Sequence, residues 1–188
     1  MAPDAAPPPA GGPFGLDGPE TARLAELCAE AAAPLGVDGA RLVAEIGRGR
    51  PLGEALGLPA GLAEALYARA HTWFAAGRHD RAEALFRAVC ALDGRSADAW
   101  IGYGVCLRLR GAGREAGLAV ATAVALRPDW ALARVHAAGL AAATGEWDLA
   151  ARHLAAFAAC DGPDTPSDLR REAAQLGRAM AQRQGQAR

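Results

Sequence analysis

The chain has 188 residues, of which 52% are hydrophobic and 22% charged, and its formal net charge is −1. This length predicts one domain with a buried core, and the balance of 20 basic and 21 acidic residues excludes a nucleic-acid binder that works through a broad basic surface. All the basic residues are arginine, which excludes mechanisms that need a lysine, such as Schiff-base chemistry or a phosphate-binding loop.

The first segment, residues 1–16, is rich in Pro, Ala and Gly and is predicted to be a disordered tail, because it can bury little surface. It lacks the charged start and continuous apolar run of a secretory signal, so we expect none. No stretch of about 18 uncharged apolar residues occurs anywhere in the chain, so we expect no membrane span.

The next segment, residues 17–58, is predicted to be a helical N-terminal region. Asp17 can cap a helix over about residues 18–32, and Glu20 completes a capping box. Asp38 can cap a second, short helix in the same way. The apolar positions of these helices could form a dimer contact or pack onto the segment that follows: Leu24, Leu27, Leu42, Val43 and Ile46.

Small residues then recur every 34 positions, which is the period of the tetratricopeptide repeat, a pair of antiparallel helices. A small side chain is needed where two helices touch, and a left-handed glycine suits the turn between them. Three sets of residues keep this spacing. The set predicted at the turn between the two helices is Gly77, Gly111 and Gly145. The two sets predicted at the contact between the helices are Ala70, Gly104 and Ala138, and Ala82, Ala116 and Ala150.

The period predicts three repeats within residues 59–162, at about 63–96, 97–130 and 131–162. A C-terminal capping helix is expected over 163–183, because a repeat stack must end in a helix with one polar face. Residues 184–188 are expected to fray. The predicted fold is therefore all-α: a right-handed tetratricopeptide superhelix of three helix pairs, with N-terminal helices and a C-terminal capping helix.

Residues suited to catalysis are few. The four histidines fall at different phases of the repeats, and no zinc-protease, serine-hydrolase or phosphate-loop motif occurs. The four cysteines form no C-x-x-C pair and are predicted to be reduced, apolar core residues of a cytosolic protein. We therefore expect no enzyme, no catalytic residue, no cofactor and no metal site.

The concave face of the repeats is the remaining candidate site, because the first helices of such a stack line an inner groove. An apolar groove with aromatic residues suits an extended peptide with apolar anchors. Tyr67 and Phe74 could instead pack beneath the N-terminal helices. The helical phases predict these groove residues: Tyr67, His71, Phe74, Ile101, Val105, Arg108, Leu132, Val135 and Gly139.

Several segments form a pattern more specific than the 34-residue period. They are residues 53–58 and 66–70 before and within the first repeat, residues 77–93 that continue it, residues 101–106 (Ile-Gly-Tyr-Gly-Val-Cys) and residues 136–138 (His-Ala-Ala). This pattern resembles the class II chaperones of type III secretion systems, the low-calcium-response or SycD/LcrH family. The first segments resemble the entry to the family's first repeat, residues 101–106 its G-x-G-x-C stretch, and residues 136–138 the start of its H-A-A-E-C stretch.

The resemblance spans about residues 47–160 and implies a function. Members of this family are cytosolic chaperones that hold P-x-L-x-x-P-like segments of hydrophobic, pore-forming translocators in the concave groove, and many dimerise through N-terminal helices. Such a chaperone needs no cofactor, because its task is to shield apolar segments from aggregation. The alternative is a general tetratricopeptide scaffold that assembles a protein complex without an export client.

Overall fold

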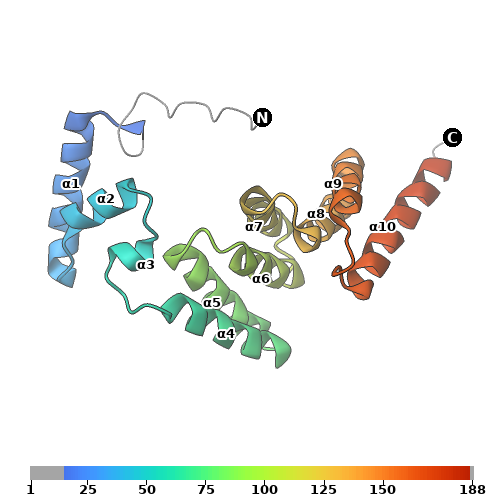
Figure 1. Cartoon of the computed structure of the whole chain (residues 1–188), viewed down its shortest axis with the longest axis horizontal. Helices are drawn as coiled ribbons and strands as arrows, with labels where there is room; N and C mark the ends of the chain where they lie inside the picture. Colours follow the sequence, from blue (N-terminus) through green and yellow to red (C-terminus); the bar gives the residue numbers. More distant parts are fainter. Residues whose placement is uncertain (1–14, 187–188) are drawn as a thin grey trace. The chain divides into compact units, whose positions relative to one another are not determined.

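The computed structural model describes residues 15–186, so most of the predicted tail at residues 1–16 lies outside the described residues. Within this range the regular structure is helical throughout, which confirms the predicted all-α class. The chain divides into two compact units, Met1–Ala63 and Glu64–Arg188. Figure 1 shows the helices of both units in chain order, and each unit is described by itself below.

The first unit begins with the predicted capping box. The backbone N–H of Glu20 donates to Oδ1 of Asp17 at 2.8 Å, and the N–H of Asp17 donates to Oε2 of Glu20 at 2.9 Å. Asp38 caps the second helix as predicted, by accepting from the N–H of Arg41 at 3.0 Å. The elements of this unit are α1 (Gly18–Ala32), the 3-10 helix η2 (Ala33–Leu35), α2 (Gly39–Gly47) and α3 (Leu52–Ala55).

Gly39, the first residue of α2, sets how closely α1 and α2 approach each other. A Cβ atom at this position would overlap the carbonyl oxygen of Cys28 on α1. Backbone atoms cannot yield as a flexible side chain can, so only glycine allows this close approach.

The second unit consists of antiparallel helix pairs followed by a long final helix. The pairs α6–α7 and α8–α9 lie inside the predicted ranges 97–130 and 131–162, and the first pair starts one residue before position 63. The final helix runs three residues past the predicted end at 183. The elements are α4 (Leu62–Ala75), α5 (His79–Leu92), α6 (Ala97–Leu109), α7 (Gly113–Leu126), α8 (Ala131–Ala143), α9 (Trp147–Cys160) and α10 (Ser167–Gln186).

The turn within each pair is made by the glycine that the 34-residue period singled out. Gly77, Gly111 and Gly145 have φ angles of 72°, 84° and 81°. A residue with a Cβ is strained in this left-handed conformation, so glycine ends the first helix and lets the chain reverse.

The small residues at the other two phases lie where the helices of a pair touch, as predicted. Ala70, Ala82, Ala116 and Ala138 have no exposed surface. At Gly104, an added Cβ would lie 2.8 Å from Cγ2 of Val120 on the partner helix α7. A larger side chain at any of these contacts would push the two backbones apart.

The capping helix α10 packs on α8 and α9 through its apolar face. Leu169 and Ala173 of α10 form a buried cluster with Val135 of α8 and Phe157 of α9, and Leu176 packs against this cluster. The cluster closes the end of the repeat stack, so α10 decides which residues of α8 remain accessible.

Candidate functional site

An apolar pocket of about 280 Å³ lies on the first helices of the three pairs. We call it the groove pocket. Helices α4, α6 and α8 supply most of its walls, as the projection of the helical phases predicted. Its lining residues are Tyr67, His71, Phe74, Phe86, Asp98, Ile101, Gly102, Val105, Trp130, Leu132 and His136.

Aromatic rings of α4 form one wall of the groove pocket. Tyr67, His71 and Phe74 are spaced at i, i+4 and i+7, so they project from one face of the helix. The hydroxyl of Tyr67 lies 2.9 Å from Nε2 of His71, and the two rings meet edge to face with centroids 4.7 Å apart. This contact fixes both side chains on the wall and gives an otherwise apolar surface one polar edge.

Phe86 supports this wall from α5, the second helix of the first pair. Its side chain is only 1% exposed, and its ring lies 5.7 Å from Tyr67 and 5.4 Å from His71 between centroids. Gly102 makes room for it, because a Cβ there would lie 2.6 Å from the Phe86 ring. Sequence reasoning missed both residues, although the G-x-G spacing of Gly102 and Gly104 was a signal that two close approaches occur on α6.

Among the described residues, Asp98 is the one carboxylate that lines the groove pocket, and it forms an ion pair. Nη2 of Arg127 lies 2.7 Å from Oδ2 of Asp98, and the same guanidinium stacks 3.7 Å above the ring of Trp130. Burial raises the pKa of Tyr67, the Asp98 charge adds to this rise and Arg127 opposes it. The phenol therefore stays neutral, and the pocket offers an apolar surface with a neutralised rim.

The structure brings together five of the seven site residues predicted for client contact. Tyr67, His71 and Phe74 of α4 and Ile101 and Val105 of α6 all line the groove pocket. Ile101 is only 5% exposed and contributes wall rather than open surface.

The other two predicted site residues, Arg108 and Val135, do not line the pocket. Val135 is fully buried against Phe157 and Leu169, because α10 covers that face of α8. The projection of helical phases took no account of this cover. Gly139, also expected in the groove, faces α10 in the same way, since a Cβ there would meet Leu176 at 3.9 Å.

His136 takes the place of Val135 on the third wall. It lines the groove pocket together with Leu132, which the phases did predict. Burial lowers the pKa of His136, and the positive charge of Arg108 lowers it further, whereas the negative charge of Glu172 opposes the shift. Arg108 is exposed and lies outside the pocket. It affects His136 in the pocket through its positive charge.

A wider cavity of about 640 Å³ adjoins the groove pocket and shares Trp130, Leu132 and His136 with it. Its lining is acidic, with carboxylates at Asp129, Asp164, Asp168 and Glu172. Among residues 15–186, no three His, Cys, Asp or Glu side chains are placed to hold a metal ion.

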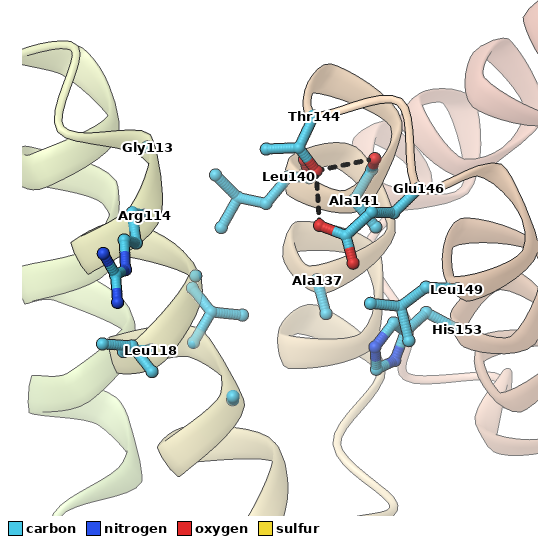
Figure 2. Close-up of a pocket in the computed structure, with 13 residues that line it drawn as sticks. Gly113, Arg114, Leu118, Ala137, Leu140, Ala141, Thr144, Glu146, Leu149 and His153 are labelled. Carbon is cyan, nitrogen blue, oxygen red and sulfur yellow. Dashed lines mark hydrogen bonds between the residues drawn. The ribbon is translucent and has the colours of Figure 1, made fainter.

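A third cavity, of about 350 Å³, lies between the second and third helix pairs, away from the groove pocket. Figure 2 shows it with Arg114 and Leu118 of α7 on one side and Ala137, Leu140 and the start of α9 on the other. We call it the seam pocket. Sequence reasoning did not predict it. His153 of α9 also lines this cavity and is partly buried.

None of the helices described here is both long and apolar enough to cross a membrane. No protein-family model and no curated protein sequence matches the chain. Solved structures do match it, and among them are chaperones and complexes of type III secretion systems.

Three of these structures show the extent of the likeness. A type III secretion complex from Aeromonas hydrophila is 23% identical, with a TM-score of 0.65, and the match covers 77% of this chain and 95% of that one. SycD of Yersinia enterocolitica, solved with a peptide of the translocator YopD, is 20% identical, with a TM-score of 0.62 and coverage of 67% and 97%.

PcrH of Pseudomonas aeruginosa, solved with the chaperone-binding region of PopB, is 27% identical, with a TM-score of 0.56 and coverage of 66% and 98%. The fold of this chain is therefore that of the translocator chaperones. The resemblance predicted from the sequence is confirmed at the level of the fold.

Proposed function

We propose that this chain is a chaperone of a type III secretion system, that it binds hydrophobic translocator proteins in the groove pocket, and that it acts in the bacterial cytoplasm. One observation carries the proposal: an apolar, aromatic-walled pocket lies on the first helices of a fold shared with SycD and PcrH. SycD was solved with a peptide of the translocator YopD, and PcrH with the chaperone-binding region of PopB.

The chemistry of the groove pocket suits an extended segment with apolar anchors. A pocket of about 280 Å³ accepts one or two side chains, and burying apolar surface there stabilises the complex without a nucleotide or metal. The Asp98–Arg127 pair leaves no uncompensated charge at the rim to oppose an apolar client. We expect a client segment of the P-x-L-x-x-P type that the family resemblance implies.

The proposed client contacts are those predicted side chains that line the pocket, together with two residues of α8. Binding rather than catalysis is the proposed role, and the similar solved structures are described as chaperones. The proposed contacts are Tyr67, His71, Phe74, Ile101, Val105, Leu132 and His136.

Co-expression tests the proposal against the alternative of a general interaction scaffold. The chain is produced together with a hydrophobic translocator of the same bacterium, and the soluble fraction of the translocator is measured. A chaperone is expected to move most of the translocator into the soluble fraction as a complex that survives gel filtration. If the translocator stays insoluble, the chaperone proposal is wrong and the scaffold alternative is favoured.

Two variants place the client contact in the groove pocket. The double change Tyr67→Ala with Phe74→Ala removes one wall, and Val105→Glu puts a charge into the pocket. Both are expected to weaken client binding at least tenfold while far-ultraviolet circular dichroism shows unchanged helicity. Leu118→Ala is the matched control, because it removes an exposed leucine from the seam pocket instead.

A homodimer through the N-terminal helices is a second part of the proposal. Leu27 and Leu35 of the first unit are 53% and 79% exposed, and SycD has been solved in more than one dimer arrangement. Val43, which was expected either to contact a second copy or to pack within the chain, is only 6% exposed and therefore belongs to the core. Sedimentation equilibrium is expected to show a dimer that Leu27→Asp converts to a monomer, and an unchanged mass would contradict this interface.

A further inference from the structure

The seam pocket lies between the second and third helix pairs. The boundary between the first and second pairs, which we call the first seam, contains side chains that the seam pocket lacks. Corresponding helices start 34 residues apart, at His79 and Gly113 for α5 and α7 and at Ala97 and Ala131 for α6 and α8. The residues at the two seams can therefore be compared position by position.

Large side chains fill the seam between the first and second pairs. Tyr103 of α6 packs against the buried clusters of both pairs and so joins them. Beside it, Nε of Arg110 lies 2.9 Å from Oε2 of Glu83, and this ion pair links the end of α6 to α5. The Glu83 side chain is only 15% exposed and the Arg110 side chain is 59% exposed, so the pair covers the edge of this seam.

The equivalent positions at the second seam are Ala137, Thr144 and Gly117, 34 residues after Tyr103, Arg110 and Glu83. A phenol ring, a guanidinium and a carboxylate are thus absent. The Thr144 hydroxyl turns back to its own helix and to Glu146, as the dashed lines of Figure 2 show. An added Cβ on Gly117 would meet no atom within 4 Å. The missing side chains account for the cavity of about 350 Å³.

The walls that remain are apolar, and one of them is open to solvent. Leu140 and Leu149 face the cavity from α8 and α9, and Leu118 on α7 is 66% exposed. Leu118 is continuous with these apolar walls, and a contiguous apolar surface, unlike a single exposed leucine, indicates an interaction site.

The charges around the seam pocket are asymmetric. Arg114 on the α7 side makes no ion pair with another described residue, whereas the Glu146 carboxylate on the opposite side accepts from Thr144. His153 adds no positive charge at neutral pH, because burial and the nearby Arg134 lower its pKa. An anionic group is therefore favoured beside Arg114.

We propose that the seam pocket binds a protein partner that inserts one aromatic side chain, with a carboxylate beside it that pairs with Arg114. The inserted ring occupies the space that Tyr103 fills at the first seam, and aromatic anchors in such pockets dominate the affinity of protein interfaces. This surface is separate from the groove pocket, so the proposal does not rest on the translocator function.

Methyl NMR of the full chain tests the site with defined probes: the amides of acetyl-Asp-Tyr, acetyl-Lys-Tyr and acetyl-Asp-Ala. Saturable shifts are expected at Leu118, Leu140 and Leu149 with the first probe. Several-fold weaker binding is expected with the lysine probe, and none with the alanine probe. Arg114→Gln is expected to remove the preference for aspartate. Shifts confined to the groove pocket, or no shifts, would overturn the proposal.

A variant whose own side chains fill the seam pocket tests whether the probe binds there. Ala137→Tyr copies the first seam, and Gly117→Glu with Thr144→Arg adds its ion pair. The triple variant is expected to fold with at least the wild-type melting temperature, to lose the aspartyl-tyrosine shifts at least tenfold and to keep client binding in the groove pocket. Unchanged probe binding by a folded variant would overturn the site.

Should the triple variant misfold, Ala137→Phe alone provides the same blockage and the same expected tenfold loss. Sedimentation of the wild type tests whether a second copy of this chain, rather than a different protein, occupies the seam pocket. A dimer that Ala137→Phe dissociates, but Leu27→Asp does not, would show that a second copy of the chain fills the seam pocket and would overturn a distinct partner.

Discussion

The hydroxyl of Tyr67 lies 2.9 Å from Nε2 of His71, one turn further along α4, and both rings rest on Phe86 of α5. A residue of the second helix thereby positions two residues of the first helix. The wall of the groove pocket is therefore a three-ring unit, and its members are expected to respond together to substitution.

Phe86→Ala is expected to lower the free energy of unfolding by about 3–5 kcal/mol, because it deletes a buried ring and leaves a cavity. Urea unfolding monitored by circular dichroism measures this loss. Phe86→Leu serves as the control and is expected to cost clearly less, since it retains most of the buried apolar volume. Equal effects of the two changes would contradict the close packing of the ring against Tyr67 and His71.

Tyr67→Phe removes only the hydroxyl and its contact with His71. The contact lies at the protein surface, so the expected loss of unfolding free energy is small, about 0.5–1 kcal/mol. Client affinity, measured by isothermal titration calorimetry, is expected to fall much less than for the double alanine change at Tyr67 and Phe74. A loss as large as that of the double change would show that the hydroxyl, rather than the ring, binds the client.

Two glycines that both lie within helices provide a matched pair. Gly104→Ala places a Cβ 2.8 Å from Cγ2 of Val120 and is expected to cost about 1–3 kcal/mol of stability. Gly117→Ala meets open space and is expected to add about 0.5–1 kcal/mol, because alanine favours helix. Thermal unfolding of both variants measures the difference, and the same sign for both would refute the predicted close contact at Gly104.

The cysteines are expected to divide into two classes of reactivity. Burial raises the pKa of Cys90 to about 12 and that of Cys106 to about 11, and both side chains are buried. The thiolate is the reactive form, so neither should react with a disulfide reagent at pH 8 in the native protein. Cys28 and Cys160 are partly exposed and are expected to react first. Mass spectrometry of the labelled peptides measures the order, and early labelling of Cys90 would contradict it.

Stability is expected to fall on acidification because of His136. Its pKa in the folded chain lies below the ordinary value of about 6.5, so the unfolded chain binds the proton first as the pH falls. The contribution of His136 to the free energy of unfolding is complete above about pH 6.5. It is lost as the pH falls through the lower pKa that His136 has in the folded chain. Urea midpoints between pH 7.5 and 5 measure this loss.

His136→Gln is the matched variant for this pH dependence, because it retains a polar side chain that does not titrate in this range. It is expected to flatten the decline only in part, since burial also lowers the pKa of His153. A variant with the same pH profile as the wild type would show that His136 does not contribute.

The repeat architecture could be predicted from the sequence because its causes are local. A left-handed turn requires glycine, and the three turn glycines at Gly77, Gly111 and Gly145 adopt φ angles of 72–84°. A contact between two helices requires small residues, and Ala70 and Ala116 have no exposed surface. Such requirements recur at a fixed spacing, so the period alone locates the helices and their touching faces.

The wall of α4 could be predicted for the same reason. Tyr67, His71 and Phe74 share one helical face, and periodicity determines which residues share a face. It does not determine what covers that face. Val135 has the phase of a groove residue but is buried, because α10 packs over it.

By itself, the sequence determined the helix pairs, their turns, the contacts within each pair and the aromatic face of α4, all of which follow from the helical period. Only the tertiary structure decided how neighbouring helices fill the space between them. Phe86 reaches the groove pocket past Gly102, and Ala137 leaves the seam pocket open where Tyr103 closes the first seam. Packing between helices depends on the volumes of side chains distant in sequence, which no period within one helix records.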